Sequence, residues 1–242
     1  MKIRILGTGG ATPSLRRLSS SCLVSTSEGN ILIDVGPSVV RRLLEFGCDL
    51  DDVDIIVLTH FHPDHSVDLA TLLFAYSYGE WKREKDLLLI GGRGIGPFFR
   101  RLSRLYPWVA PVGYRLDIKA LTQGAATAWG QTSLSTAHML HREESIGVRI
   151  EERGKSFVFS GDAGYSPALV ALADAADLLI AECTFPEEKA PGHLNLAALL
   201  KIVEEAKPRR VIMSHLSPQW EEFHGTLPAP LLLGEDCLSI DL

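Results

Sequence analysis

The chain has 242 residues, with 24 lysines and arginines, 30 aspartates and glutamates, and 46% hydrophobic residues. This composition excludes a disordered chain, and no apolar run reaches the roughly 18 residues that a membrane-spanning helix needs. The formal net charge of −6 argues against a nonspecific nucleic-acid-binding protein, which needs a basic face to release counterions. Four cysteines without tight spacing and a strand-like start predict free thiols, no signal peptide and a cytoplasmic protein without a membrane partner.

The first half of the sequence predicts strands that give way to alternating helices and strands. A strand is predicted at Lys2–Leu6, and the turn residues Glu28-Gly29-Asn30 predict a hairpin between strands at Cys22–Ser25 and Asn30–Val35. The following elements are a helix at Ser38–Phe46, a buried strand at Val53–Leu58, a helix at His65–Tyr78, a strand at Leu87–Ile90 and a helix at Pro97–Tyr106. For Arg100, Arg101 and Arg104 on the last helix, a solvated cationic face and a surface that steers an anionic substrate are the two interpretations.

The middle of the chain is rich in predicted strands, and its last third alternates again. The strands of the middle are Tyr114–Leu121, Ala125–Ala137, Gly147–Glu152 and Ser156–Ser160, with a hairpin turn at Arg153-Gly154-Lys155. The later elements are a helix at Pro167–Ala175, a strand at Asp177–Ala181, a helix at Leu194–Ala206, a strand at Arg210–Ser214 and an apolar stretch at Cys237–Leu242. Without a repeat or a long linker, this pattern predicts one α/β domain over residues 1–242, with two sheets and outer helices in a four-layer αββα sandwich.

The segment Thr59-His60-Phe61-His62-Pro63-Asp64-His65 places three imidazoles and a carboxylate directly after a buried strand. Because strand C-termini in α/β proteins face the ligand crevice, this position favours a functional site. His60 and His62 can converge on one metal ion, whereas the adjacent Asp64 and His65 point elsewhere and suit a second ion. A histidine-rich surface loop without a ligand is the alternative interpretation.

Three residues at later strand ends can complete the coordination of two ions. His141 follows the predicted strand that ends at Ala137, Asp162 follows the strand that ends at Ser160, and His215 follows Ser214. Each ion would then have three or four protein ligands and an open position for water. We assign His60, His62 and His141 to one ion, Asp64, His65 and His215 to the other, and Asp162 to a bridge between them.

The HxHxDH motif, with the later His, Gly-Asp and Ser-His positions, resembles the metallo-β-lactamase fold superfamily over essentially the whole chain. The resemblance implies an αββα sandwich with two divalent metal ions, usually zinc, with manganese as the alternative. The opening Leu6-Gly7-Thr8-Gly9-Gly10-Ala11-Thr12-Pro13 is similar to that of ribonuclease Z and its small relatives. So are Ala181-Glu182-Cys183-Thr184-Phe185 and Gly192-His193-Leu194.

The resemblance to ribonuclease Z implies roles for further residues. His141, six residues before Gly147, is favoured over His138 as the ligand. A glutamate and a histidine of that family are implicated in proton transfer to the leaving group, which implies Glu182 and His193 here, while Asp64 would orient the attacking water. Capping of the following helix is the alternative interpretation of His193.

The sequence therefore predicts a metal-dependent hydrolase, with an anionic phosphodiester as the first choice of substrate. Two divalent ions leave the site positive, so it attracts such a substrate and stabilises the charge that develops on it. RNA is not favoured, because the chain has no long glycine- and proline-rich arm like the one that clamps tRNA in ribonuclease Z.

Two other functional classes are open on the same residues. Hydrolysis of another small ester, such as a thiolester, a lactone or an arylsulfate, needs the same metal site. A redox metalloprotein is the further alternative, and His62 argues against it, because the diiron oxidoreductases of the superfamily usually have glutamate there. Family relatives are often homodimers, which implies a homodimer by analogy only.

Overall fold

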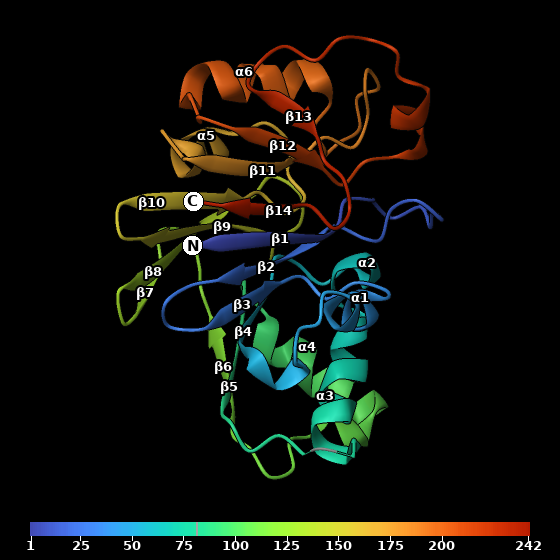
Figure 1. Ribbon diagram of the computed structural model, residues 1–242, viewed down its shortest axis with the longest axis vertical. Helices are drawn as coiled ribbons and strands as arrows, with labels where there is room; N and C mark the ends of the chain where they lie inside the picture. Colours follow the sequence, from blue (N-terminus) through green and yellow to red (C-terminus); the bar gives the residue numbers. More distant parts are fainter. Residues whose placement is uncertain (81) are drawn as a thin grey trace.

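Two seven-stranded sheets lie face to face between two layers of helices, which confirms the predicted four-layer αββα sandwich (Figure 1). The computed structural model describes residues 1–80 and 82–242. The helices that cover the first sheet are α1 (Val39–Glu45), α3 (Asp68–Tyr78) and α4 (Ile95–Leu105). The helices that cover the second sheet are α5 (Pro167–Ala173) and α6 (Leu196–Ala206). In the part of the chain described, no helix is long and apolar enough to span a membrane.

The first sheet has the strand order β14-β1-β2-β3-β4-β5-β6. Its strands are β1 (Lys2–Gly7), β2 (Ser21–Ser25), β3 (Asn30–Ile33), β4 (Val53–Leu58), β5 (Leu87–Gly91), β6 (Leu116–Ala120) and β14 (Ser239–Asp241). The predicted hairpin joins β2 to β3, with Ser25 opposite Asn30. Strands β3 to β6 are parallel, so their C-terminal ends lie at one edge of the sheet. The last strand pairs with the first, which brings the two termini together.

The second sheet has the order β13-β12-β11-β10-β9-β8-β7. Its strands are β7 (Ala126–Trp129), β8 (Thr132–His138), β9 (Ile146–Glu152), β10 (Lys155–Phe159), β11 (Leu178–Glu182), β12 (Val211–Ser214) and β13 (Leu231–Leu233). Strands β10 to β13 are parallel. Short helical turns complete the fold: α2 (Pro63–Ser66) and the 3₁₀ turns Leu50–Asp52, Pro107–Val109 and Pro218–Glu222.

Alternating side chains on the strands build three separate apolar layers. In β4, Ile55 and Val57 face the other sheet, whereas Ile56 and Leu58 face the helices. The period of two in an extended strand produces this division, so a strand buried on both faces has an almost continuous apolar sequence. The packed layers hold the strand ends in fixed positions, and the loops that follow them inherit that rigidity.

Two sequence predictions about these elements are wrong. The segment Ala125–Ala137 is a hairpin rather than one strand, because the chain turns at Gly130, whose φ of 56° suits glycine. The predicted helix His65–Tyr78 is divided into α2 and α3 at Val67. Pro63 at the first position of α2 starts the helical turn earlier than the apolar spacing predicts.

Gly36 allows the loop after β3 to pack directly against the metal-motif loop. A Cβ atom at Gly36 would lie 1.9 Å from the carbonyl oxygen of Asp64, so no side chain fits there. We expect Gly36→Ala to lower the free energy of unfolding by about 1–3 kcal/mol, because overpacking displaces backbone. Urea unfolding measures this loss. Gly96→Ala in α4 is the matched control, because the nearest atom to its added Cβ is 3.6 Å away, and it should be neutral or stabilising. Equal losses of unfolding free energy in the two variants would contradict the packing role of Gly36.

Candidate metal centre and active site

The motif loop begins where β4 ends and places its side chains at the edge of the sandwich. His60 follows Thr59 at the end of the strand and is fully buried, as is His65 in the turn α2. His62 occupies the residue before α2, and Pro63 fixes the first helical position behind it. The buried end of β4 and the turn α2 therefore fix the backbone of this loop, and the side chains of His60, His62 and Asp64 extend from it in different directions.

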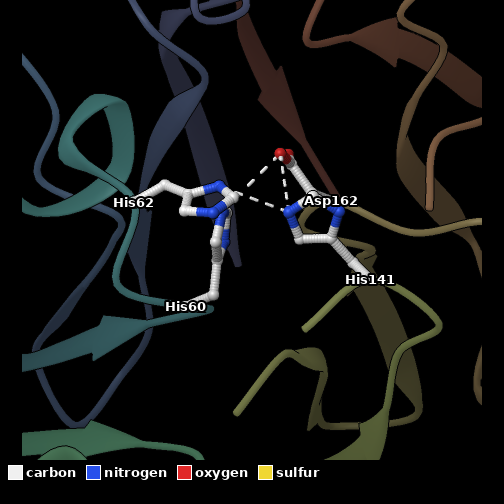
Figure 2. Close-up of side chains that lie close together, drawn as sticks. All are labelled: His60, His62, His141 and Asp162. Atoms are coloured by element: carbon white, nitrogen blue, oxygen red, sulfur yellow. Dashed lines mark hydrogen bonds and ion pairs between the residues drawn. The ribbon is translucent and has the colours of Figure 1, made fainter. Parts of the chain in front are cut away.

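Segments far apart in sequence bring the other predicted ligands to this loop. His141 follows β8, Asp162 follows β10 and His215 follows β12, all at one edge of the second sheet. The ligand atoms fall into two groups, and within each group they lie within 4.8 Å of one another. One group is His60, His62, His141 and Asp162, whose rings and carboxylate converge in Figure 2, and the other is Asp64, His65 and His215.

The distances between ligand atoms suit a shared ion. Ligand atoms around a tetrahedral zinc ion with bonds of about 2.0–2.1 Å lie about 3.4 Å apart. Asp162 Oδ1 lies 3.3 Å from His65 Nε2, and its Oδ2 lies 3.3 Å from His215 Nε2, 3.7 Å from His60 Nε2 and 3.8 Å from His141 Nε2. The oxygens of Asp162 approach members of both groups, which is the position that a bridging ligand requires.

Unpartnered atoms at the centre provide a test of whether these residues fit a metal. His60 Nε2, His65 Nε2, His215 Nε2 and Asp162 Oδ1 are buried and have no hydrogen-bond partner. Leaving a buried polar atom unpaired costs about 1–3 kcal/mol, so four such atoms within the two ligand groups need partners. Imidazole nitrogens and carboxylate oxygens are the donor types that a divalent transition-metal ion takes, so the residues fit such a group.

The charge states of His60 and Asp64 suit coordination. At His65 and His215, burial lowers the pKa, but Asp162 and the other nearby carboxylates raise it more, so an ion binding there would displace a proton. Burial, followed by the nearby charge of His65, lowers the pKa of His60 to about 2, so its ring is neutral. Burial raises the pKa of Asp64, but His215, whose Nε2 lies 3.5 Å from Asp64 Oδ2, and the charge of His65 outweigh it and bring that pKa to about 2. Neutral imidazole and ionised carboxylate are the forms that bind metals.

Glu182 and His193, implied only by resemblance, lie together beside the ligands. His193 Nδ1 is 3.1 Å from Glu182 Oε1, and the His193 side chain keeps 21% of its surface exposed toward the pocket. Burial lowers the pKa of His193, but the hydrogen bond and charge of Glu182 raise it more, so the net shift is upward. The capping interpretation of His193 is wrong, because Asn195 caps α6 by accepting from the Ala198 N–H.

His193 also has a second possible position in the coordination geometry. Its nitrogen groups with Asp162 and His215 within the same distance limit as the other clusters. A metal in that group would compete with Asp64 and His65 for His215. The hydrogen bond to Glu182 occupies Nδ1 of His193, so Nε2 is the ring nitrogen that remains available in the pocket.

A cavity of about 320 Å³ opens beside the centre. Asp64, Asp162 and His215 are among its polar lining residues, and Phe185 and Ala190 are among its apolar ones. This volume is near the lower end of the roughly 300–1,000 Å³ typical of ligand pockets. The site thus admits a small substrate or the tip of a larger one.

Asp34, Thr59 and Thr184 support this site, although the sequence analysis assigns no role to them. Asp34 Oδ2 lies 2.8 Å from His65 Nδ1, and Thr59 and Thr184 contact His60 and His215 in the same way. Asp34 and His215 both have a positive φ, 60° and 55°, a left-handed conformation that residues other than glycine rarely adopt. The signal in the sequence was an aspartate at the end of an apolar strand, just like Asp162.

The structure separates the two candidate histidines near β8. His138 is the last residue of that strand and is exposed, whereas His141 Nε2 lies 3.3 Å from His62 Nδ1 within the cluster. We expect His141→Ala to lose bound metal and His138→Ala to keep the wild-type content, measured by elemental analysis after reconstitution with zinc. Loss of metal in His138→Ala alone would reverse the assignment.

Comparisons with known proteins agree with this fold. The sequence matches the family described as "Anti-Pycsar protein Apyc1" over residues 1–229. It is 28% identical to the probable metallo-hydrolase YhfI of Bacillus subtilis, over 89% of this chain and 87% of that protein. It is 27% identical to ribonuclease Z of Mycolicibacterium gilvum, over 74% of this chain and 68% of that protein.

Solved structures show the same architecture. Human tRNase Z, short form, superimposes with a TM-score of 0.84 at 22% identity, covering 100% of this chain and 99% of that one. The crystal structure of the metallo-β-lactamase fold protein YhfI gives a TM-score of 0.82 at 21% identity, with coverages of 99% and 98%. The chain therefore belongs to the family described as anti-Pycsar protein Apyc1, among the ribonuclease Z-like metallo-hydrolases of the metallo-β-lactamase fold.

Proposed function

We propose that this protein is a phosphodiesterase that uses two divalent metal ions, zinc in preference to manganese, to hydrolyse small anionic phosphodiesters. The observation that supports it most is the set of four buried, unpartnered atoms that face one centre. Two ions, rather than one, are supported by the two ligand groups and by the position of Asp162, whose oxygens approach members of both. The residues that would hold them are His60, His62, His141, Asp64, His65, His215 and Asp162.

Divalent ions in this centre would activate water at neutral pH and stabilise the negative charge of a phosphoryl group. The protein's own residues supply the remaining needs of the reaction. The Asp64 carboxylate lies on the pocket wall, where it can accept a hydrogen bond from the attacking water and orient it. His193 is partly buried in the pocket lining and can donate a proton to the leaving oxygen from Nε2, while Glu182 holds its Nδ1.

The sequence favours a small phosphodiester over tRNA, and the pocket has room for such a substrate. Phe185 and Ala190 are among the residues that line the cavity of about 320 Å³. The sequence has no long glycine- and proline-rich arm to hold a folded RNA away from the centre. The relatives named ribonuclease Z and tRNase Z support phosphodiester chemistry at this centre.

A panel of substrates tests the proposal against the other esters. Metal-stripped protein reconstituted with zinc or manganese would be assayed on bis-p-nitrophenyl phosphate, cyclic nucleotides, precursor tRNA, lactones, thiolesters and arylsulfates. We expect phosphodiesters to be cleaved fastest, and chelation to reduce the rate to background because the centre has no other source of activated water. His138→Ala, outside the cluster, is the matched control and should behave as wild type.

The result that would contradict the proposal is fast hydrolysis of a lactone, thiolester or arylsulfate with no cleavage of any phosphodiester. Such a result would still support the metal centre, but it would assign the protein to another substrate class. A coloured, redox-active protein with iron would instead support the redox alternative, because a zinc protein is colourless.

A further inference from the structure

Two threonines connect buried carboxylates to candidate metal ligands, one in each sheet. In the first sheet, Thr59 Oγ1 lies 2.8 Å from Asp34 Oδ2 and 3.1 Å from His60 Nδ1. Asp34 and Thr59 follow the neighbouring parallel strands β3 and β4, so the sheet itself sets their spacing. The Thr59 hydroxyl is therefore fixed between an acid and a histidine.

The second sheet repeats this arrangement with different residues. Thr184 Oγ1 lies 2.7 Å from Glu182 Oε2 and 2.9 Å from His215 Nδ1. Glu182 ends β11 and His215 follows the neighbouring parallel strand β12. All four threonine and carboxylate residues, Asp34, Thr59, Glu182 and Thr184, are buried, so water does not compete for these bonds.

Counting donors fixes the direction of each hydrogen bond. An ionised carboxylate only accepts, and a threonine hydroxyl has one hydrogen to donate. Glu182 accepts from the backbone N–H groups of Ala163 and Leu194 and from His193, and Asp34 accepts from the Thr59 N–H and from His65. Each threonine therefore donates its hydrogen to its carboxylate and must accept from the histidine.

We propose that Thr59 and Thr184 are positioning residues that hold His60 and His215 with the proton on Nδ1 and the Nε2 lone pair free for a metal ion. The unpartnered Nε2 atoms of both histidines are the ends of these two chains of hydrogen bonds. The other ligands with an Nδ1 contact outside the cluster are held differently: Asp34 holds His65 directly, and the Gly192 carbonyl holds His141. The inference rests on the proposed metal centre and is independent of the substrate.

Zinc affinity of threonine variants tests the proposal. Valine keeps the shape of threonine and removes the hydroxyl, so Thr59→Val and Thr184→Val leave the histidine without its acceptor. Partners of this kind typically cost 10–100-fold in metal affinity when they are removed, so we expect a loss of about that size for each variant. Serine keeps the hydroxyl, so Thr59→Ser and Thr184→Ser should bind zinc within a few-fold of wild type. A chelator competition assay on metal-stripped protein measures all of these.

Thr132→Val is the matched control. Its hydroxyl lies 3.3 Å from the Glu152 carboxylate, it is buried, and it contacts no histidine. This change should leave zinc affinity unaltered while it removes a comparable threonine–carboxylate bond. Wild-type zinc affinity in both Thr59→Val and Thr184→Val would overturn the proposal. Equal losses of zinc affinity in the serine and valine variants would also overturn it. Failure of the wild-type protein to bind zinc would overturn the proposed metal centre itself.

Nitrogen NMR of the wild-type protein gives a second test that does not depend on any variant folding. Two-bond ¹H–¹⁵N spectra of zinc-loaded protein report which ring nitrogen of each histidine carries the proton. We expect His60 and His215 to be protonated at Nδ1. Protonation of either ring at Nε2 would contradict the hydrogen-bond directions derived above.

Discussion

Asp162→Ala is expected to lower zinc affinity at both positions at once, by at least about 100-fold, because removing even a residue behind a ligand costs 10–100-fold. The structural reason is that Asp162 approaches members of both ligand groups, with oxygens 3.3 Å from His65 Nε2 and 3.7 Å from His60 Nε2. Hydrolysis should fall to the metal-free rate. Metal content by elemental analysis, before and after dialysis against a weak chelator, measures the loss.

The isosteric variant Asp162→Asn and a distant control separate coordination from folding. Asparagine keeps the shape and one oxygen but loses the charge, so zinc affinity should fall less than in the alanine variant. Asp177 is another buried aspartate, which accepts from the Ser156 N–H at the far side of β10. Asp177→Ala should cost stability and leave zinc binding unchanged. Retention of one tightly bound ion in Asp162→Ala would contradict the bridging role.

His193→Ala is expected to slow phosphodiesters with alkoxide leaving groups about 10²–10⁴-fold, the usual contribution of a general acid. Substrates that release p-nitrophenolate should be affected much less, because that leaving group is already a stable anion. The geometry behind this expectation is the 3.1 Å contact of Glu182 with Nδ1 of His193, which directs Nε2 toward the pocket. Rates on paired alkyl and p-nitrophenyl substrates measure the difference.

Two further variants control this experiment. Glu182→Gln should show the same selective loss at a smaller size, because glutamine still contacts the ring but no longer stabilises its charge. His224→Ala removes an exposed histidine far along the chain and should change neither rate. Equal losses on both types of leaving group, with zinc content unchanged, would assign His193 to substrate positioning instead of proton transfer.

The sequence predicted most of the fold because its strands are buried on one or both faces. Val53–Leu58 has the same bounds in the structure as in the prediction, because its nearly continuous apolar run is typical of a strand buried on both faces. The hairpin β7–β8 was merged into one strand, because Gly130 alone marks a turn that its neighbours do not. The short strand β13 was missed, because three residues carry too little periodicity to recognise.

The sequence singles out the candidate metal ligands, but not the residues that hydrogen-bond to those ligands. His60, His62 and Asp64 stand out because histidine and aspartate are dense after a strand, and the other assigned ligands come to the same place in the fold. Asp34, Thr59 and Thr184 do not stand out, because a buried acid or hydroxyl becomes informative only when its neighbours in space are known. Parallel pairing of β3 with β4 and of β11 with β12 creates those neighbours.

The central claim is that two metal ions occupy one centre formed by both sheets. A crystal of the zinc-reconstituted protein, measured on both sides of the zinc absorption edge, tests it most directly. We expect two anomalous peaks about 3.5–4 Å apart, with Asp162 between them. One peak should lie among His60, His62 and His141, and the other among Asp64, His65 and His215. A single peak elsewhere, or none of these side chains within about 2.5 Å of either peak, would contradict it.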